Sequence, residues 1–276
     1  MFAGRTLVIA TMHGKERVIA PLLEQHLHVR CTVVERLDTD QLGTFTGEIE
    51  RVLDPLEAAR RKCELAMELT GADLAVASEG SFGAHPSLFF AAADDELVVL
   101  VDRLNGVEIV GRELSTDTNF DSAEITSEQE LRDFAERVGF PEHALILRAA
   151  KAGELAKGLH DWDALLFAYR RMVTAHGKVT AETDMRAMHN PRRMQVIAQA
   201  AQRMVERALV TCAECRTPGF GLVDIRRGLP CGWCGTPTEG VLALVNGCAK
   251  CGHREELPPP DGRASADPQW CPVCNP

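Results

Sequence analysis

Eight of the ten cysteines lie between residues 212 and 274, and they form four Cys-x-x-Cys pairs. The pairs are Cys212/Cys215, Cys231/Cys234, Cys248/Cys251 and Cys271/Cys274. Fifteen residues separate the first two pairs and nineteen separate the last two, a spacing typical of tetrahedral zinc sites with four thiolate ligands. The cysteines therefore predict two zinc ions. Because sulfur would fill all four positions of each ion, both ions should be structural.

The spacing leaves open which pairs share an ion. The simplest arrangement joins consecutive pairs into two tandem zinc ribbons over residues 210–276, and we expect that one. The alternative is an interleaved arrangement, in which alternate pairs share a metal. A redox role for the Cys-x-x-Cys pairs fits less well, because no strand-then-helix pattern surrounds each of them.

A second group of reactive residues follows the first expected strand, residues 6–10. Thr11, His13, Gly14 and Lys15 lie between that strand and a helical pattern. Backbone N–H groups at the start of a helix, together with a lysine ammonium, can bind the same anion. The segment therefore predicts a phosphate-binding loop, although it is not a Walker sequence and could equally be an ordinary strand-to-helix turn.

Three acidic residues are candidates for magnesium ligands. Asp38 and Asp40 follow the second apolar run, and Glu79 ends the apolar run 72–78 just before a glycine. Carboxylates at strand ends point into the crevice where α/β sheets bind ligands, and Mg²⁺ prefers such oxygen ligands together with phosphate. Asp38 and Asp40 could instead be solvated loop residues.

The segment 170–207 is basic, with eight Lys and Arg against three Asp and Glu. Within it, Arg186, His189, Arg192 and Arg193 are candidates for binding a phosphate or a base. Arg192 and Arg193 fall in the first turn of an expected helix, where a cation opposes the helix dipole and a bound anion would relieve the conflict. The alternative is that these arginines are simply solvated.

The elements that must position these residues alternate between strand and helix. Apolar runs at 6–10, 72–78, 97–102 and 107–113 predict strands, with Asn105-Gly106 turning the last two into a hairpin. Asp54-Pro55-Leu56-Glu57 predicts a helix start, and further helices should begin near Ser127 and Asn190. Residues 1–209 should thus form a mixed-sheet α/β domain.

Composition limits the partners. The 40 Asp and Glu against 30 Lys and Arg give a formal charge of −10, which disfavours a broad nucleic-acid interface. No apolar run is long enough to span a membrane, and the first residues lack the pattern of a secretion signal. We therefore expect a cytoplasmic protein with reduced thiols, in which clustered cysteines bind metal.

The chain resembles a bacterial family catalogued only as a domain of unknown function. The likeness lies in the segments ATMHGKE, DTDQLGTFTGEIER, ASEGSFG and ETDMRAMHNPRRM and in the ending CPVCNP. That resemblance implies no activity.

A more distant resemblance concerns residues 5–115, which are similar to the inosine/xanthosine triphosphate pyrophosphatases. It lies in Leu7-Val8-Ile9-Ala10-Thr11 with Lys15, in Ala59-Arg60-Arg61-Lys62 and in Ala75-Val76-Ala77-Ser78-Glu79-Gly80. The resemblance implies a cleft between two lobes, with Thr11 and Lys15 on triphosphate, Glu79 with Asp38 or Asp40 on Mg²⁺, and Arg186 and His189 near the base. His13-Gly14 departs from the asparagine usual in that loop.

The leading hypothesis is a Mg²⁺-dependent nucleotide phosphohydrolase that splits a nucleoside triphosphate into monophosphate and pyrophosphate, with a structural zinc-ribbon tail. The alternative is a non-enzymatic module, either a zinc-ribbon adaptor or a nucleotide sensor, that binds a protein or RNA partner through the ribbons.

Overall fold

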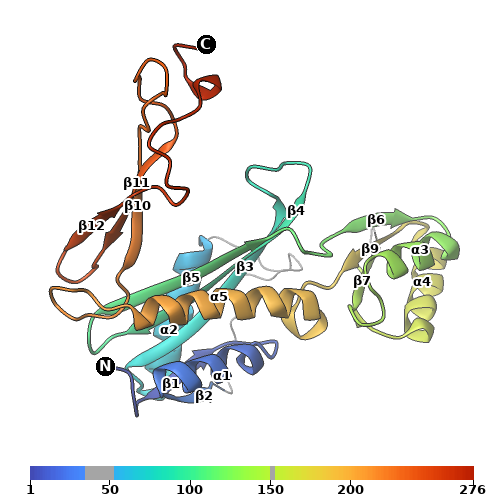
Figure 1. Ribbon diagram of the computed structural model, residues 1–276. Coiled ribbons are helices and arrows are strands. Elements are labelled where there is room, and N and C mark those ends of the chain that lie inside the picture. Colours follow the sequence, from blue (N-terminus) through green and yellow to red (C-terminus); the bar gives the residue numbers. More distant parts are fainter. Residues whose placement is uncertain (35–52, 150–152) are drawn as a thin grey trace. The chain divides into compact units, whose positions relative to one another are not determined.

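The computed structural model describes residues 1–34, 53–149 and 153–276. Three open sheets and several helices confirm the expected mixed α/β class (Figure 1). The described chain separates into two compact units. One unit comprises residues 2–101 and 110–205, and the other comprises Met1, residues 102–109 and residues 206–276. We call them the α/β unit and the ribbon unit.

The largest sheet has the strand order β2-β1-β3-β4-β5. Its strands are β1 (Thr6–Ala10), β2 (Arg30–Val33), β3 (Leu74–Ala84), β4 (Ala92–Asp102) and β5 (Val107–Ser115). Strand β1 runs parallel to both β2 and β3, and Ala10 lies beside Ala77. The loop that follows β1 therefore begins level with Ser78 and Glu79 of β3, at the edge where parallel sheets bind ligands.

Helices α1 (Glu16–Leu27) and α2 (Pro55–Thr70) follow β1 and precede β3. Asp54 caps α2 by accepting hydrogen bonds from the backbone N–H groups of Leu56 and Glu57, as its sequence predicts. Gly71 ends the helix with a φ of 72°. The apolar face of α2, which includes Cys63, packs against one face of β1, β3 and β4. This packing holds α2 in a fixed position over the first half of β3.

Helix α5 (Pro191–Leu209) packs against β5 at a glycine. A Cβ atom on Gly111 would lie 2.3 Å from both the carbonyl oxygen of Ala200 and the backbone nitrogen of Met204. Only a residue without a side chain permits this approach, because helix backbone cannot move aside as a side chain can. The close contact fixes the start of α5, and hence Arg193, over the sheet.

A second sheet in the α/β unit has the order β6-β9-β7-β8. Its elements are β6 (Ser122–Ile125), α3 (Glu128–Arg137), β7 (Leu145–Ala149), β8 (Leu155–Leu159), α4 (Trp162–His176), β9 (Val179–Thr183) and the 3₁₀ turn η2 (Ala187–His189). The paired strands are antiparallel, and α3 and α4 bury their apolar faces against them. Ser127 and Asp161 cap the two helices.

The ribbon unit is built on the three-stranded antiparallel sheet β10-β11-β12. The strands are β10 (Gly221–Arg227), β11 (Val241–Gly247) and β12 (Arg254–Leu257), and the 3₁₀ turn η3 (Pro268–Trp270) follows. The turn between β4 and β5 belongs to this unit, where the Lys250 ammonium lies 3.4 Å from the Asn105 carbonyl oxygen. The sequence alone does not assign that turn to the ribbon.

Among the helices of the described residues, none combines the length and the apolar character that crossing a membrane requires.

Candidate functional site

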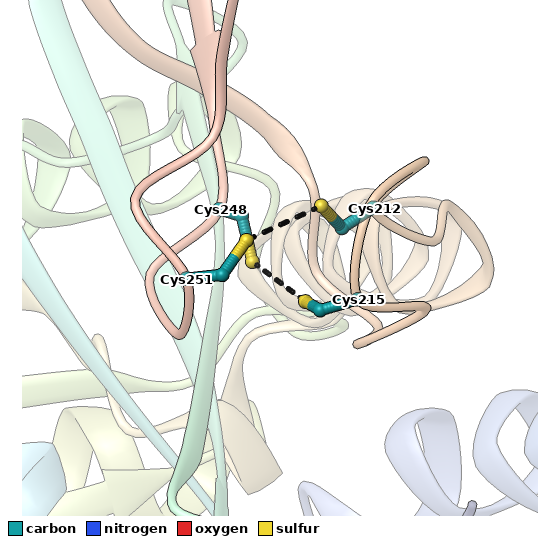
Figure 2. A group of neighbouring side chains, drawn as sticks. All are labelled: Cys212, Cys215, Cys248 and Cys251. Carbon is teal, nitrogen blue, oxygen red and sulfur yellow. Dashed lines mark hydrogen bonds between the residues drawn. The ribbon is translucent and has the colours of Figure 1, made fainter.

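Two clusters of four cysteines lie in the ribbon unit. In the first, the Sγ atoms of Cys212 and Cys251 are 3.7 Å apart and those of Cys215 and Cys248 are 3.6 Å apart (Figure 2). A zinc ion with four sulfur ligands at about 2.3 Å requires sulfur atoms about 3.8 Å from one another. The first cluster therefore has the dimensions of a zinc site.

The second cluster has the same dimensions. The Sγ atoms of Cys231 and Cys274 are 3.9 Å apart, and those of Cys234 and Cys271 are 3.6 Å apart. The two clusters can therefore hold one zinc ion each, as the sequence predicts. With four thiolates per ion, neither has a position for water or substrate, so both ions would be structural.

The expected tandem pairing of the cysteines is wrong, and the interleaved alternative is the one observed. The antiparallel register explains it. Gly221 at the start of β10 lies beside Gly247 at the end of β11. The knuckle before β10, which is the turn that carries Cys212 and Cys215, therefore meets the knuckle after β11, which carries Cys248 and Cys251. The knuckle that follows β10, with Cys231 and Cys234, pairs with the last knuckle, with Cys271 and Cys274. An isolated β-bridge between Cys231 and Ala266 helps to align these two segments.

The thiols have partners that favour a bound cation. The hydroxyl groups of Thr217 and Thr236 lie 3.2 Å and 3.3 Å from the sulfur atoms of Cys215 and Cys234. These contacts, with backbone N–H groups of the same threonines, lower the pKa of both thiols to about 6. In turn, the hydrogen bond with Cys234 raises the pKa of Cys274 to about 12. Four thiols cannot all ionise at this distance without a cation, which zinc supplies.

A separate cluster of charged side chains is buried beside the end of β1 and the middle of β3. The Lys15 ammonium donates a hydrogen bond of 3.1 Å to the Ser78 hydroxyl and lies 3.4 Å from the Ser78 carbonyl oxygen. Burial, and then the charge of Arg193, lower the pKa of Lys15 to about 8, although the charges of Glu96 and Glu79 oppose the shift. The pKa of Lys15 therefore depends on the other charges of this cluster.

Glu96 and Arg193 form an ion pair with no solvent exposure of either side chain. The Arg193 Nε lies 2.6 Å from a Glu96 carboxylate oxygen, and the guanidinium also donates to the Met185 carbonyl oxygen. A Cβ on Gly80 would lie 2.1 Å from the same carboxylate, so the absence of a side chain there makes room for Glu96. An ion pair buried this completely loses a large free energy of hydration.

Asp94 lies beside Glu96 on the same strand face and is 1% exposed. Neither of its carboxylate oxygens has a hydrogen-bond partner among the described residues. Burial, and next the charge of Glu96, raise the pKa of Asp94 to about 8. Asp94 is therefore mostly protonated at neutral pH, and Glu96 carries the negative charge of the two.

Glu79 lies on the opposite face of β3 from Ser78, because successive strand residues alternate in direction. Its carboxylate forms an ion pair with Lys62 of α2, and both side chains are largely buried. Glu79 nevertheless lies close enough to Lys15 to raise the pKa of that ammonium. The cations Lys15 and Lys62 thus lie near the same part of β3 from its two faces.

The other sequence-predicted residues have separate positions. Thr11 is buried and its hydroxyl donates to the Met12 carbonyl oxygen, while His13 and Gly14 are half-buried with φ angles of 68° and 73°. Arg192 lies 3.6 Å from the Asp117 carboxylate. Asp38 and Asp40 lie outside the described residues.

Arg186 and His189 belong to another part of the α/β unit. Arg186 pairs with the buried carboxylate of Asp184 at 2.6 Å and borders a pocket of about 280 Å³. Burial lowers the pKa of His189, which lies near Gly158. Of the four predicted residues of the basic segment, the structure therefore brings only Arg193 into the charged cluster.

The sequence-based prediction missed Asp94 and Glu96, although the sequence carries a signal for them. The two acids alternate with Val98 and Leu100 along β4, all on one buried face. Acids that share the period of apolar core residues in a strand indicate buried carboxylates. The sequence carries no such signal for Lys62, because its contact with Glu79 depends on the packing of α2.

Comparison with known proteins shows that the model of one family, described as "Domain of unknown function (DUF6671)", matches residues 62–276. No curated protein matches the chain. Among solved structures, the lipoprotein GNA1162 from Neisseria meningitidis matches 49% of this chain and 94% of its own chain, with 13% identity and a TM-score of 0.21. A likeness that low carries no structural argument. The comparisons give no support to the resemblance with inosine/xanthosine triphosphate pyrophosphatases.

Proposed function

Since the chain belongs to the DUF6671 family, a domain of unknown function, we propose its activity from geometry alone: the α/β unit is a phosphohydrolase that cleaves a nucleoside triphosphate into monophosphate and pyrophosphate. The observation that carries the proposal is the collection of buried and largely buried cations beside the end of β1 and the middle of β3. It comprises Lys15, Lys62 and Arg193.

Among the described residues, the charges of this cluster do not balance at neutral pH. Lys15, Lys62 and Arg193 supply three positive charges, against the two carboxylates of Glu79 and Glu96. Asp94 adds no charge while it holds its proton. A buried excess of positive charge is costly unless an anion compensates it. A polyphosphate supplies that charge.

Each side chain has a role in such a reaction. Lys15 and Lys62 offset the charge that develops on the phosphate oxygens as water attacks the α-phosphorus. The bond from that phosphorus to the bridging oxygen breaks, pyrophosphate leaves, and Glu79 accepts the proton of the water. Arg193 and Glu96 fix one another and hold the start of α5 against β4.

The proposed reaction uses no magnesium ion held by these residues. Among the described residues, the acids at this edge already face cations or hold a proton. Glu79 faces Lys62, Glu96 faces Arg193, and Asp94 adjoins Glu96. The donor set of these residues does not fit a magnesium site, so the assay below is run both with Mg²⁺ and with a chelator.

The test measures pyrophosphate release from a panel of common and damaged nucleoside triphosphates, using the full zinc-loaded chain. We expect turnover of at least one of them. Glu79→Gln should lower kcat by about 10²–10⁴-fold, because the amide cannot accept a proton. Lys62→Gln should raise KM and lower kcat together.

The matched control is Arg61→Gln, which changes an exposed cation one residue away on α2, where Arg61 pairs with Glu64. It should retain wild-type activity. The melting temperature of each variant identifies a loss that comes from unfolding. Absence of pyrophosphate release from every nucleotide, or full activity of Glu79→Gln, would overturn the proposal.

A further inference from the structure

The ribbon unit contains a hollow of about 480 Å³ beside the second cysteine cluster. Much of its lining is apolar, and the apolar residues are Leu229, Val241, Pro259, Pro260, Ala266 and Trp270. Trp270 is 71% exposed, which is unusual for the residue type with the largest apolar surface. A hollow that contains an exposed tryptophan has the composition of a binding surface rather than of a core.

The backbone around the hollow is fixed by local contacts. Asp267 caps η3 through a hydrogen bond of 2.9 Å from the Gln269 backbone N–H, and the Asn275 side chain donates to the Gln269 carbonyl oxygen. The next residue, Cys271, is a fully buried member of the second cysteine cluster. The backbone that carries Trp270 is thus held by local hydrogen bonds, so ordering it on binding would cost little conformational entropy.

The rim of the hollow is acidic. Three carboxylates line it, those of Glu239, Asp261 and Asp267. Two guanidinium groups lie among them: Arg263 pairs with Asp261 at 2.7 Å, and Arg227 donates to the Glu239 carbonyl oxygen. A zinc ion with four thiolates would add two further negative charges next to Trp270. The local charge is therefore negative.

We propose that this hollow binds a basic segment of a protein partner, with an apolar side chain inserted against Trp270 and lysine or arginine side chains on the acidic rim. An indole face attracts cations as well as apolar groups, so both parts of the segment gain from the same residue. The charge argues against nucleic acid, whose phosphates the rim would repel. This inference does not depend on the proposed hydrolase activity, since every residue it uses lies in the ribbon unit.

The test uses the full zinc-loaded chain and a twelve-residue peptide in which lysines flank a central Leu-Phe pair. The chain has three tryptophans, so a ¹H–¹⁵N spectrum contains three indole signals. Titration should shift the Trp270 signal and leave that of Trp162, in the α/β unit, unchanged. Trp270→Ala should weaken binding by about tenfold or more, as expected for an aromatic anchor. Glu239→Gln should weaken it less, and added salt should weaken it further.

The matched control is Trp233→Ala, because Trp233 is also exposed and lies in the second cysteine cluster but does not line the hollow. It should bind the peptide as the wild type does. Zinc content is measured for each variant, so that a lost fold is recognised. Three results would each overturn the proposal: wild-type affinity in Trp270→Ala, equal binding of a peptide with glutamates in place of the lysines, or tighter binding of oligouridine than of the lysine peptide.

Discussion

Asp94, Glu96 and Arg193 show how the chain tolerates charge in its interior. Glu96 forms an ion pair with Arg193, and the neighbouring carboxyl group of Asp94 keeps its proton. Such a residue lowers the stability of the folded chain whenever it is forced to ionise, because an isolated buried carboxylate loses its hydration.

The pH dependence of stability should reveal Asp94. Its pKa rises from an ordinary 3.8 to about 8, so between these pH values the folded chain holds a proton that the unfolded chain releases. Raising the pH therefore favours unfolding through this group, until the loss levels off above about pH 8. Asp94→Asn, which cannot ionise, should gain stability relative to wild type as pH rises from 5 to 8.

Urea denaturation of both chains at several pH values measures this difference, since the other titrating groups are common to both. The assignment would be contradicted if the unfolding free energy of Asp94→Asn minus that of wild type stayed constant or became more negative as pH rises. Asp117→Asn is the control, because Asp117 is exposed and its carboxylate lies 3.6 Å from Arg192.

The eight metal-binding cysteines could be predicted from the sequence. Only some members of the charged cluster could be predicted in the same way. The spacing of Cys-x-x-Cys pairs is enough to indicate metal ligands. By contrast, Arg192 and Arg193 look equivalent in sequence, and only the rotation of α5 distinguishes them: Arg193 is buried against Glu96 and Arg192 lies near Asp117.

At the scale of elements, strand register decides what cysteine spacing leaves open. Two knuckles separated by fifteen residues can close on each other, but the antiparallel pairing of β10 with β11 brings the first knuckle to the third. Register depends on contacts along both strands, and no local pattern encodes it.

Paired substitutions distinguish the two ways of sharing the ions. Cys212→Ser with Cys248→Ser affects one site in the observed arrangement, so one zinc ion per chain should remain. Cys212→Ser with Cys231→Ser affects both sites, so neither should keep its ion tightly. Tandem pairing gives the opposite result for both variants. Native mass spectrometry of the purified variants counts the ions, and Cys31→Ser, which changes a cysteine outside both clusters, should retain two.

Helix starts were the elements best predicted from sequence. Asp54 before Pro55 and Ser127 before Glu128 begin helices as expected, because a cap is a local hydrogen bond. Strand ends were less predictable: β3 continues to Ala84, beyond the expected end near Ser78. Neighbouring strand β4 extends β3, and that pairing is not visible in a window of a few residues.

At the scale of the whole molecule, the two units obtain their stability from different sources. The α/β unit has large apolar clusters, whereas the cluster of the ribbon unit is small and is formed by Cys212, Phe220 and Cys248. Among the other described residues of the ribbon unit, a few apolar side chains such as Leu229 and Val245 are also buried. A unit with so little apolar burial depends on its metal, since a structural zinc ion contributes about 10–16 kcal/mol of binding free energy in small domains.

Removal of zinc by a chelator should therefore unfold one unit and spare the other. We expect fast amide exchange across residues 206–276 and in the 102–109 turn, which belongs to the same unit. Amides of β7 and α4 should stay protected. Hydrogen exchange with mass spectrometry measures both regions in one experiment, and readdition of zinc should restore protection. Simultaneous loss of protection in the two units would show that the α/β unit does not fold independently of the metal.

The interleaved cysteines also bear on events at the ribosome. As the chain is synthesised, Cys212, Cys215, Cys231 and Cys234 emerge from the ribosome first, and they form a complete set of four thiols before Cys248 emerges. A zinc ion captured at that moment binds a non-native set, and it must later exchange two ligands to reach the final one. Correct assembly of the ribbon is thus a competition between the time of metal delivery and the rate of translation.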